Sequence, residues 1–219
     1  MAKKIEVGVI GLGKFGHVLA ASLKGHGHIV VGIDNGEGKI KRAQEVLDHV
    51  YQADATDKTA LEQIGVQDLD HVVVSTGNSM EASILVALNL KEIGVRSIWV
   101  KAISQEHTKI LKRLGVDHVV FPEHDVARQV ANRIAIPGIM DYLSLGEEII
   151  IRELEVERWE GKTLRDLQLP TRYQVQVVAM KRVAEQGYNF VPSADRSLQK
   201  GDVLVLLGNR ADVLKASDQ

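Results

Sequence analysis

Three glycines near the start of the chain are spaced as a phosphate-binding turn requires. Gly11, Gly13 and Gly16 follow an apolar run at 7–10 and lead into a helical pattern. Gly11 can adopt the positive φ of a tight turn, and Gly13 has no side chain, so a pyrophosphate can lie against the backbone. Gly16 lets the following helix pack closely on its strand. The N-terminus of the following helix favours negative charge. The spacing therefore predicts that phosphate binds at this turn.

An acid follows the next apolar run, where a site of this kind holds a ribose. Asp34 directly follows the run 29–33. A carboxylate there can accept hydrogen bonds from the ribose diol and would repel a 2′-phosphate, which disfavours NADP. Strand, glycine turn, helix, strand and acid together predict a dinucleotide-binding βαβ unit. The competing interpretation is a glycine turn in the same fold that binds nothing.

The elements around these residues form a repeating pattern. Six short apolar runs alternate with helical patterns up to about residue 122. This alternation predicts an α/β fold, a Rossmann-like doubly wound parallel sheet with strand order 3-2-1-4-5-6 and its ligand beside the first strand. Asn78 is the expected cap of the helix after the fourth strand, with Glu81 completing a capping box.

The pattern changes after the sixth strand. We expect one helix over Pro122–Ile136, a break at Pro137-Gly138 and a second short helix with Ile139, Met140 and Leu143 on its apolar face. Two exposed apolar helices are hard to bury within one chain, so we expect them to pack against a second copy.

The last part of the chain reads as a small α+β domain. The expected division is a nucleotide-binding domain at 1–122, crossover and dimerisation helices at 123–146, and a C-terminal domain at 147–219.

The composition is that of a water-soluble globular protein. The 219 residues are 45% apolar and 26% charged, and the net charge of −2 suggests neither nucleic acid nor a membrane surface as partner. The absence of cysteine excludes disulfides and thiolate metal sites. No stretch approaches the roughly 18 apolar residues of a membrane-spanning helix. We interpret Lys3 and Lys4 with the following apolar run as the first strand, not as a signal peptide.

Four stretches of the chain form a recognisable set of motifs: the glycine run 9–16, Asp54-Ala55-Thr56-Asp57, Phe121-Pro122-Glu123 and the C-terminal stretch 198–204. Together they resemble the RCK (KTN) family, the cytosolic regulatory subunits of Trk- and Ktr-type potassium transporters. The resemblance covers nearly the whole chain and is closest to KtrA-like members. It implies a sensor that binds ATP or ADP, or NAD(H), and that is not an enzyme.

The resemblance also implies a set of site residues. They are Gly11, Gly13, Lys14, Phe15, Gly16, Asp34, Asn35, Asp54, Ala55, Thr76, Gly77, Lys101 and Glu123. Glu123 is in addition the implied ligand of a divalent cation such as Mg²⁺ between subunits. Ser75 would line the pocket next to Thr76.

Four positions depart from the family pattern. Lys14 stands where an arginine is frequent, and lysine supplies a point charge in place of a bidentate fork. Ala53 replaces a glycine, His124 a more basic residue, and Gln176 an asparagine of the C-terminal domain.

Partners and location are likewise implied by the resemblance. The family dimerises through its crossover helix and forms an octameric ring under a membrane-embedded potassium-translocating subunit. This chain would then lie in the cytoplasm, peripheral to the inner face of the cell membrane. Cyclic di-AMP is a further candidate ligand near Arg172 and Tyr173, and no nucleic acid partner is implied.

The alternative function is an NAD-dependent oxidoreductase. Such an enzyme needs a group that handles a proton beside the nicotinamide. No tyrosine is followed by lysine four residues later, no histidine follows His124, and Lys101 is the remaining candidate at a strand end. Two site residues also have simpler interpretations, because Asp54 could start a turn and Glu123 could stabilise a helix N-terminus.

Overall fold

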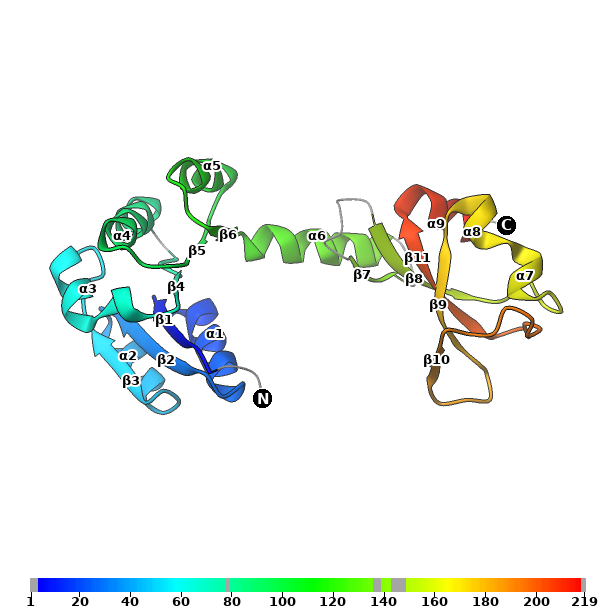
Figure 1. Cartoon of the computed structure of the whole chain (residues 1–219), viewed down its shortest axis with the longest axis horizontal. Helices are drawn as coiled ribbons and strands as arrows, with labels where there is room; N and C mark the ends of the chain where they lie inside the picture. Colours follow the sequence, from blue (N-terminus) through cyan, green and yellow to red (C-terminus); the bar gives the residue numbers. More distant parts are fainter. Residues whose placement is uncertain (1–3, 78, 136–138, 143–148, 218–219) are drawn as a thin grey trace. The chain divides into compact units, whose positions relative to one another are not determined.

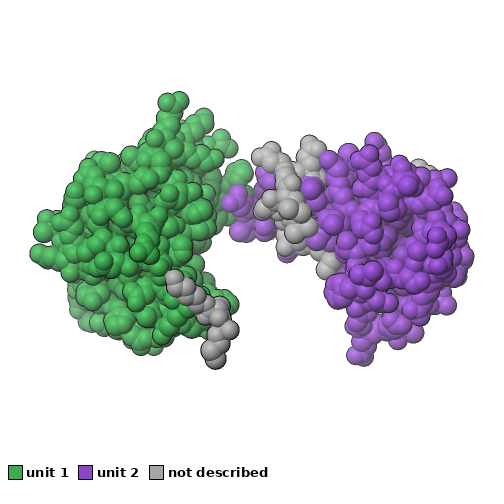
Figure 2. All heavy atoms as spheres, in the orientation of Figure 1, with its two compact units in different colours: residues 1–124 green, residues 125–219 purple. Residues whose placement is uncertain are grey.

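The computed structural model describes residues 4–77, 79–135, 139–142 and 149–217. The chain divides into two compact units, 1–124 and 125–219, which Figure 2 colours separately and which are described in turn. The three-part division at 122 and 146 stays a prediction, because much of the segment 136–148 lies outside the described residues.

The first unit is built on a parallel sheet of six strands in the order β3-β2-β1-β4-β5-β6 (Figure 1). Its strands are β1 (Glu6–Ile10), β2 (Ile29–Asp34), β3 (His49–Gln52), β4 (His71–Val74), β5 (Ile98–Lys101) and β6 (His118–Val120). The predicted strand order is confirmed. Strands β2 and β3 are added on one side of β1, and strands β4, β5 and β6 on the other side. This switch in strand order leaves a crevice at the carboxyl ends of β1 and β4.

Helices connect these strands. They are α1 (Lys14–Gly25), α2 (Glu37–Gln44), α3 (Lys58–Ile64), the 3-10 turn η1 (Val66–Asp68), α4 (Met80–Ile93) and α5 (Gln105–Arg113). The cap of α4 is Ser79, whose side chain accepts a hydrogen bond from Ala82 N at 3.0 Å. The predicted cap was one residue earlier, at Asn78, which lies outside the described residues.

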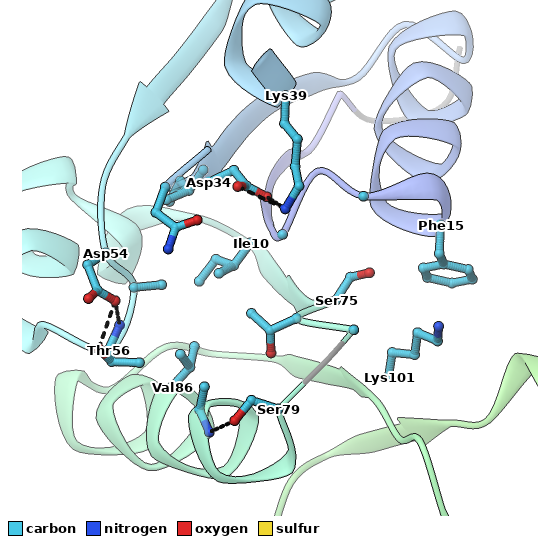
Figure 3. A pocket seen from close by; sticks show the side chains of 18 of the residues that line it. Ile10, Phe15, Asp34, Lys39, Asp54, Thr56, Ser75, Ser79, Val86 and Lys101 are labelled. Atoms are coloured by element: carbon cyan, nitrogen blue, oxygen red, sulfur yellow. Dashed lines mark hydrogen bonds and ion pairs between the residues drawn. The ribbon is translucent and has the colours of Figure 1, made fainter. Parts of the chain in front are cut away.

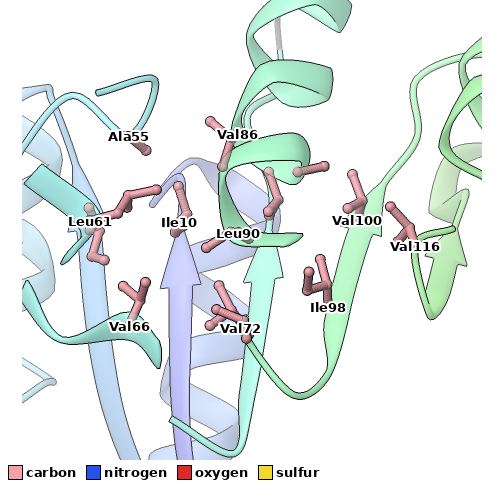
Figure 4. Packing of buried hydrophobic residues seen from close by; sticks show 14 of the residues in the cluster. Ile10, Ala55, Leu61, Val66, Val72, Val86, Leu90, Ile98, Val100 and Val116 are labelled. Atoms are coloured by element: carbon pink, nitrogen blue, oxygen red, sulfur yellow. The ribbon is translucent and has the colours of Figure 1, made fainter. Parts of the chain in front are cut away.

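The sheet carries a hydrophobic core on each face. On one face, Ile10, Val72 and Val74 pack with Leu61 of α3 and Leu90 of α4 (Figure 4). On the other face, residues of β1, β2 and β4 pack with α1 and α2, and this core includes Val7, Val9, Leu12, Ala20, Val30, Ile40, Ala43, Leu47 and Val73. Burial on both faces explains why the strands are continuous apolar runs.

The second unit is an antiparallel sheet in the order β10-β9-β11-β8-β7, packed with short helices. Its elements are β7 (Ile139–Tyr142), β8 (Ile149–Glu155), α7 (Leu164–Leu167), α8 (Leu169–Tyr173), β9 (Gln176–Lys181), β10 (Tyr188–Phe190), β11 (Val203–Asn209) and α9 (Arg210–Ser217). Ile150, Leu204 and Leu206 are fully buried in its core. The predicted fold class, a doubly wound sheet followed by a small α+β domain, is confirmed.

The region after β6 is partly as predicted. Helix α6 (Pro122–Ala135) forms, and none of its described residues is buried. Val126, Val130 and Ile134 are exposed at 54%, 49% and 78%. The predicted second helix is wrong, because residues 139–142 form β7 and pair antiparallel with β8. Four residues are too few to show a helical period, and pairing with β8 decided the conformation. Pro137-Gly138 and Leu143 lie outside the described residues.

Candidate nucleotide-binding site

A pocket of about 680 Å³ lies at the carboxyl ends of β1, β2 and β4, where the strand order reverses (Figure 3). All the site residues predicted from the sequence line it, except Gly16. Sequence reasoning did not assign to the pocket Ile10, Ile33, Lys39, Ala53, Thr56, Ser79, Ala82 and Val86. Of the last three, Ser79 is the N-cap of α4, and Ala82 and Val86 follow at helical spacing on one face of that helix. The sequence contains this spacing, which is a signal that could have found them.

The glycine turn forms one wall of the pocket. Gly11 has φ +92°, and a Cβ on it would lie 2.6 Å from the Ser75 carbonyl oxygen, so this residue must be glycine. Gly13 precedes α1 with no side-chain cap, and a Cβ there would meet nothing within 4 Å. The first N–H groups of α1 are therefore available to a ligand beside open space, as a phosphate requires.

Gly16 does not lie where a residue that contacts phosphate would be expected. It is buried and does not line the pocket. A Cβ on Gly16 would lie 1.9 Å from the Gly11 carbonyl oxygen. Gly16 therefore permits close packing of α1 against the turn, which is the packing role expected of the third glycine in this motif.

Asp34 is a buried carboxylate at the end of β2, with 5% of its surface exposed. Its Oδ2 accepts from Leu12 N at 2.7 Å, and its Oδ1 accepts from Gly36 N at 2.8 Å. Lys39 donates to both oxygens, at 3.1 and 3.2 Å. The side chain thus joins the glycine turn to the start of α2, and Figure 3 shows Lys39 directed toward it.

The loop after β3 closes another side of the pocket. Asp54 Oδ1 accepts from Thr56 N at 2.9 Å and from Thr56 Oγ1 at 2.7 Å, and these bonds lower the pKa of Asp54 below its ordinary value. Asn89 of α4 donates to Thr56 O at 3.0 Å and fixes the loop. Asp54 therefore both starts a turn and lines the pocket, so its two interpretations are compatible.

The loop after β4 contributes an unsatisfied hydroxyl. The Thr76 Oγ1 atom is buried and has no hydrogen-bond partner among the described residues, although Thr76 lines the pocket. A buried hydroxyl without a partner is costly. Its position fits a hydrogen bond to a bound ligand.

A charged pair stands at the end of β5. Lys101 Nζ lies 2.5 Å from Glu123 Oε1 and 5.7 Å from the centre of the Phe15 ring. The hydrogen bond from Lys101 lowers the pKa of Glu123 below its ordinary value. Glu123 also lies in the first turn of α6, where a carboxylate is favoured.

The donor set does not make a complete metal site within one copy. Among the described residues there is no group of three or more histidine, aspartate or glutamate side chains that could hold a metal ion. Glu123 alone supplies one carboxylate, already paired with an ammonium group. For a nucleotide the fit is better, because the pocket combines an open helix N-terminus, a buried acid and a free hydroxyl.

The described part of the chain contains no helix that is both long and apolar enough to cross a membrane. The fold and the pocket define the class to which this protein belongs: a Rossmann-type domain with a pocket at the switch point of its sheet, joined to a small α+β domain.

The comparisons with known proteins narrow this class. The TrkA-N domain matches residues 7–122 and the TrkA-C domain matches residues 150–219. The chain belongs to the RCK family of Trk- and Ktr-type potassium-uptake regulatory proteins, as the sequence motifs indicate. These proteins are regulatory subunits and not enzymes.

Two relatives match over almost their full length. Ktr system potassium uptake protein C of Bacillus subtilis (strain 168) is 37% identical over 211 residues, which are 96% of this chain and 95% of that protein. Ktr system potassium uptake protein A of Vibrio alginolyticus is 32% identical over 204 residues, 93% of this chain and 92% of that protein.

Solved structures agree with the fold. The RCK domain of GsuK superposes with a TM-score of 0.56 at 22% identity, covering 96% of this chain and 45% of that chain. GsuK bound to ADP superposes with a TM-score of 0.52 at 26% identity, covering 59% of this chain and 34% of that chain. The chain thus spans less than half the length of these structures.

Proposed function

We propose that this chain is a nucleotide-sensing regulatory subunit of a Ktr-type potassium transporter. The names of its relatives support the transporter class, since two of them are Ktr potassium uptake proteins at 37% and 32% identity. The observation that carries the sensing role is the pocket itself, in which the open N-terminus of α1 and the buried Asp34 face one space.

The ligand that suits this pocket is an adenine nucleotide, ATP or ADP, with NAD(H) as the second candidate. The N–H groups at Gly13 and the ammonium groups of Lys14 and Lys101 would hold the phosphates. Asp34 would hold the ribose, and Asp54 and Ala55 would lie on the adenosine side. GsuK, which is 26% identical over the superposed part, has been solved with ADP.

A divalent cation such as Mg²⁺ could bind at Glu123 only if groups outside this copy of the chain supplied further ligands. Glu123 is 60% exposed and supplies one carboxylate. Nucleotide phosphates or a second copy of the chain would have to complete the coordination and displace Lys101 from Glu123.

The assembly that suits the exposed helix is a dimer. The apolar side chains of α6 at 126, 130 and 134 stand one helical turn apart and would pack against a second copy. We further propose that such dimers form the family's octameric ring. The ring would lie in the cytoplasm, against a membrane-embedded potassium-translocating subunit.

Cyclic di-AMP binding near Arg172 and Tyr173 stays a prediction of the resemblance.

The oxidoreductase alternative has less support. The pocket, as the described residues form it, is lined by no histidine and no tyrosine, and Lys101 is already paired with Glu123. A group that transfers a proton beside a nicotinamide would have to be Lys101 alone.

The test is calorimetric titration of the purified chain with ATP, ADP, NAD and NADH, with and without magnesium. We expect binding to the wild type and its loss in Gly13→Asp, because the new carboxylate would enter the phosphate space without meeting the fold. Gly25→Asp is the matched control, since a Cβ at Gly25 also meets nothing within 4 Å but lies at the other end of α1.

Equal binding by Gly13→Asp and the wild type would place the ligand elsewhere. The transport role has its own readout, namely potassium uptake by cells that depend on a Ktr system at low potassium. Steady NADH oxidation on carbonyl substrates would instead support the oxidoreductase.

A further inference from the structure

The buried acid of the pocket has no acceptor position left for a ligand. An ionised carboxylate offers about four lone-pair sites. At Asp34, Oδ1 accepts from Gly36 N and Lys39 Nζ, and Oδ2 accepts from Leu12 N and Lys39 Nζ. A ribose diol that is to bind here must therefore take the place of one of these donors.

The three donors differ in how easily they can leave. Leu12 N belongs to the buried glycine turn, and Gly36 N belongs to the residue before α2, so moving either would disturb the backbone. Lys39 stands in the first turns of α2 on a flexible side chain that is 49% exposed, and it lines the pocket. The ammonium group of Lys39 can be rehydrated when it leaves, whereas the buried Leu12 N–H cannot, and the partly buried Gly36 N–H could leave only if the backbone moved.

We propose that Lys39 is a specificity-determining residue that competes with the ribose hydroxyls for Asp34. This inference rests on the proposed nucleotide-binding function. Each ribose hydroxyl that binds Asp34 replaces part of an existing ion pair, so the net gain from the diol is small. The site consequently discriminates weakly between a nucleotide with a ribose and one without the hydroxyls.

The competition has a direct measure, the ratio of two dissociation constants. ATP and 2′,3′-dideoxy-ATP carry the same phosphates and base, so the general attraction of lysine charges for phosphate cancels in their ratio. Only the interactions of the sugar hydroxyls remain. The ratio therefore reports the binding free energy that the hydroxyls contribute through Asp34.

The experiment measures this ratio by calorimetry in the full-length chain and three variants. In Lys39→Met the competitor is removed, and the preference for ATP over dideoxy-ATP should rise by about threefold to fivefold, the worth of a partly exposed ion pair. In Lys39→Arg the preference should fall, because a guanidinium group binds both carboxylate oxygens as a fork. Lys41→Met is the control, since Lys41 lies on the same helix, is 72% exposed and pairs with Glu37.

The outcomes separate the two proposals. A higher ratio in Lys39→Met, a lower ratio in Lys39→Arg and an unchanged ratio in Lys41→Met support the competition. Binding of ATP with the same ratio in wild type and Lys39→Met overturns the inference and leaves the proposed function intact. No binding of either nucleotide to the folded wild type overturns the proposed function, and the inference with it.

Discussion

At the scale of single residues, the three glycines of the turn have three separate roles. Gly11 is required by its positive φ and by the approach of the Ser75 carbonyl, and Gly13 leaves space for a ligand. Gly16 instead lets α1 approach the backbone of Gly11. The same sequence motif thus combines one conformational, one binding and one packing requirement.

Alanine substitutions should separate the packing role from the binding role. Gly16→Ala should lower the free energy of unfolding by about 2–4 kcal/mol or prevent folding, because its Cβ would meet backbone that cannot move aside. Gly13→Ala should cost less than about 1 kcal/mol, since only the cap preference is lost. Chemical denaturation with circular dichroism measures both. Equal midpoints for the two variants would contradict this assignment.

At the scale of secondary-structure elements, one residue can both cap a helix and line the pocket. Ser79 holds the first turn of α4 through its bond to Ala82 N and also lines the pocket. Asn89, further along α4, fixes the loop that carries Asp54 through the Thr56 carbonyl. Helix α4 therefore connects core packing to the geometry of the site.

Substitution of the cap should reveal its contribution. Ser79→Ala should destabilise the protein by about 1 kcal/mol, because the N–H group of Ala82 loses its acceptor. Ser79→Asp should keep the stability, since aspartate is an equally good cap, but should weaken nucleotide binding through its added negative charge. Thermal unfolding and calorimetric titration give the two readouts. A Ser79→Ala protein as stable as wild type would show that the cap has no energetic role.

At the scale of the whole molecule, α6 carries an apolar face that stays exposed in one copy. Its apolar residues at 126, 130 and 134 repeat every four positions and are all exposed. A helix of this kind is ordinarily stabilised by packing its apolar face, not by propensity alone. A second copy supplies such a surface without any additional partner.

A charge on this face should therefore weaken self-association. We expect Val130→Glu to raise the dissociation constant of the dimer about tenfold or more, because a carboxylate would be buried without a partner. Ala135→Glu places the same charge on the opposite side of the helix and should change little. Light scattering over a range of concentrations measures both. A wild type that is monomeric throughout would refute the proposed interface.

The sequence by itself determined the order of strands and helices, the glycine turn, the acid at the ribose position and the family. These depend on local rules: apolar periodicity, the φ that glycine permits, and the short distance between a strand end and the next turn. Because parallel strands bring their carboxyl ends to one edge, residues at those ends could be assigned to one pocket in advance.

Only the tertiary structure decided which groups pair across that edge. It placed Lys39 on Asp34, Lys101 on Glu123 and Gly16 behind the pocket wall, and it made 139–142 a strand through pairing with β8. These outcomes depend on how whole elements pack and on the distances between them. Lys39 is only five residues from Asp34 in the chain and Glu123 is 22 residues from Lys101, but neither separation fixes a contact. Local periodicity contains no term for such distances, so the partners of each charge become known only when the packed elements fix them.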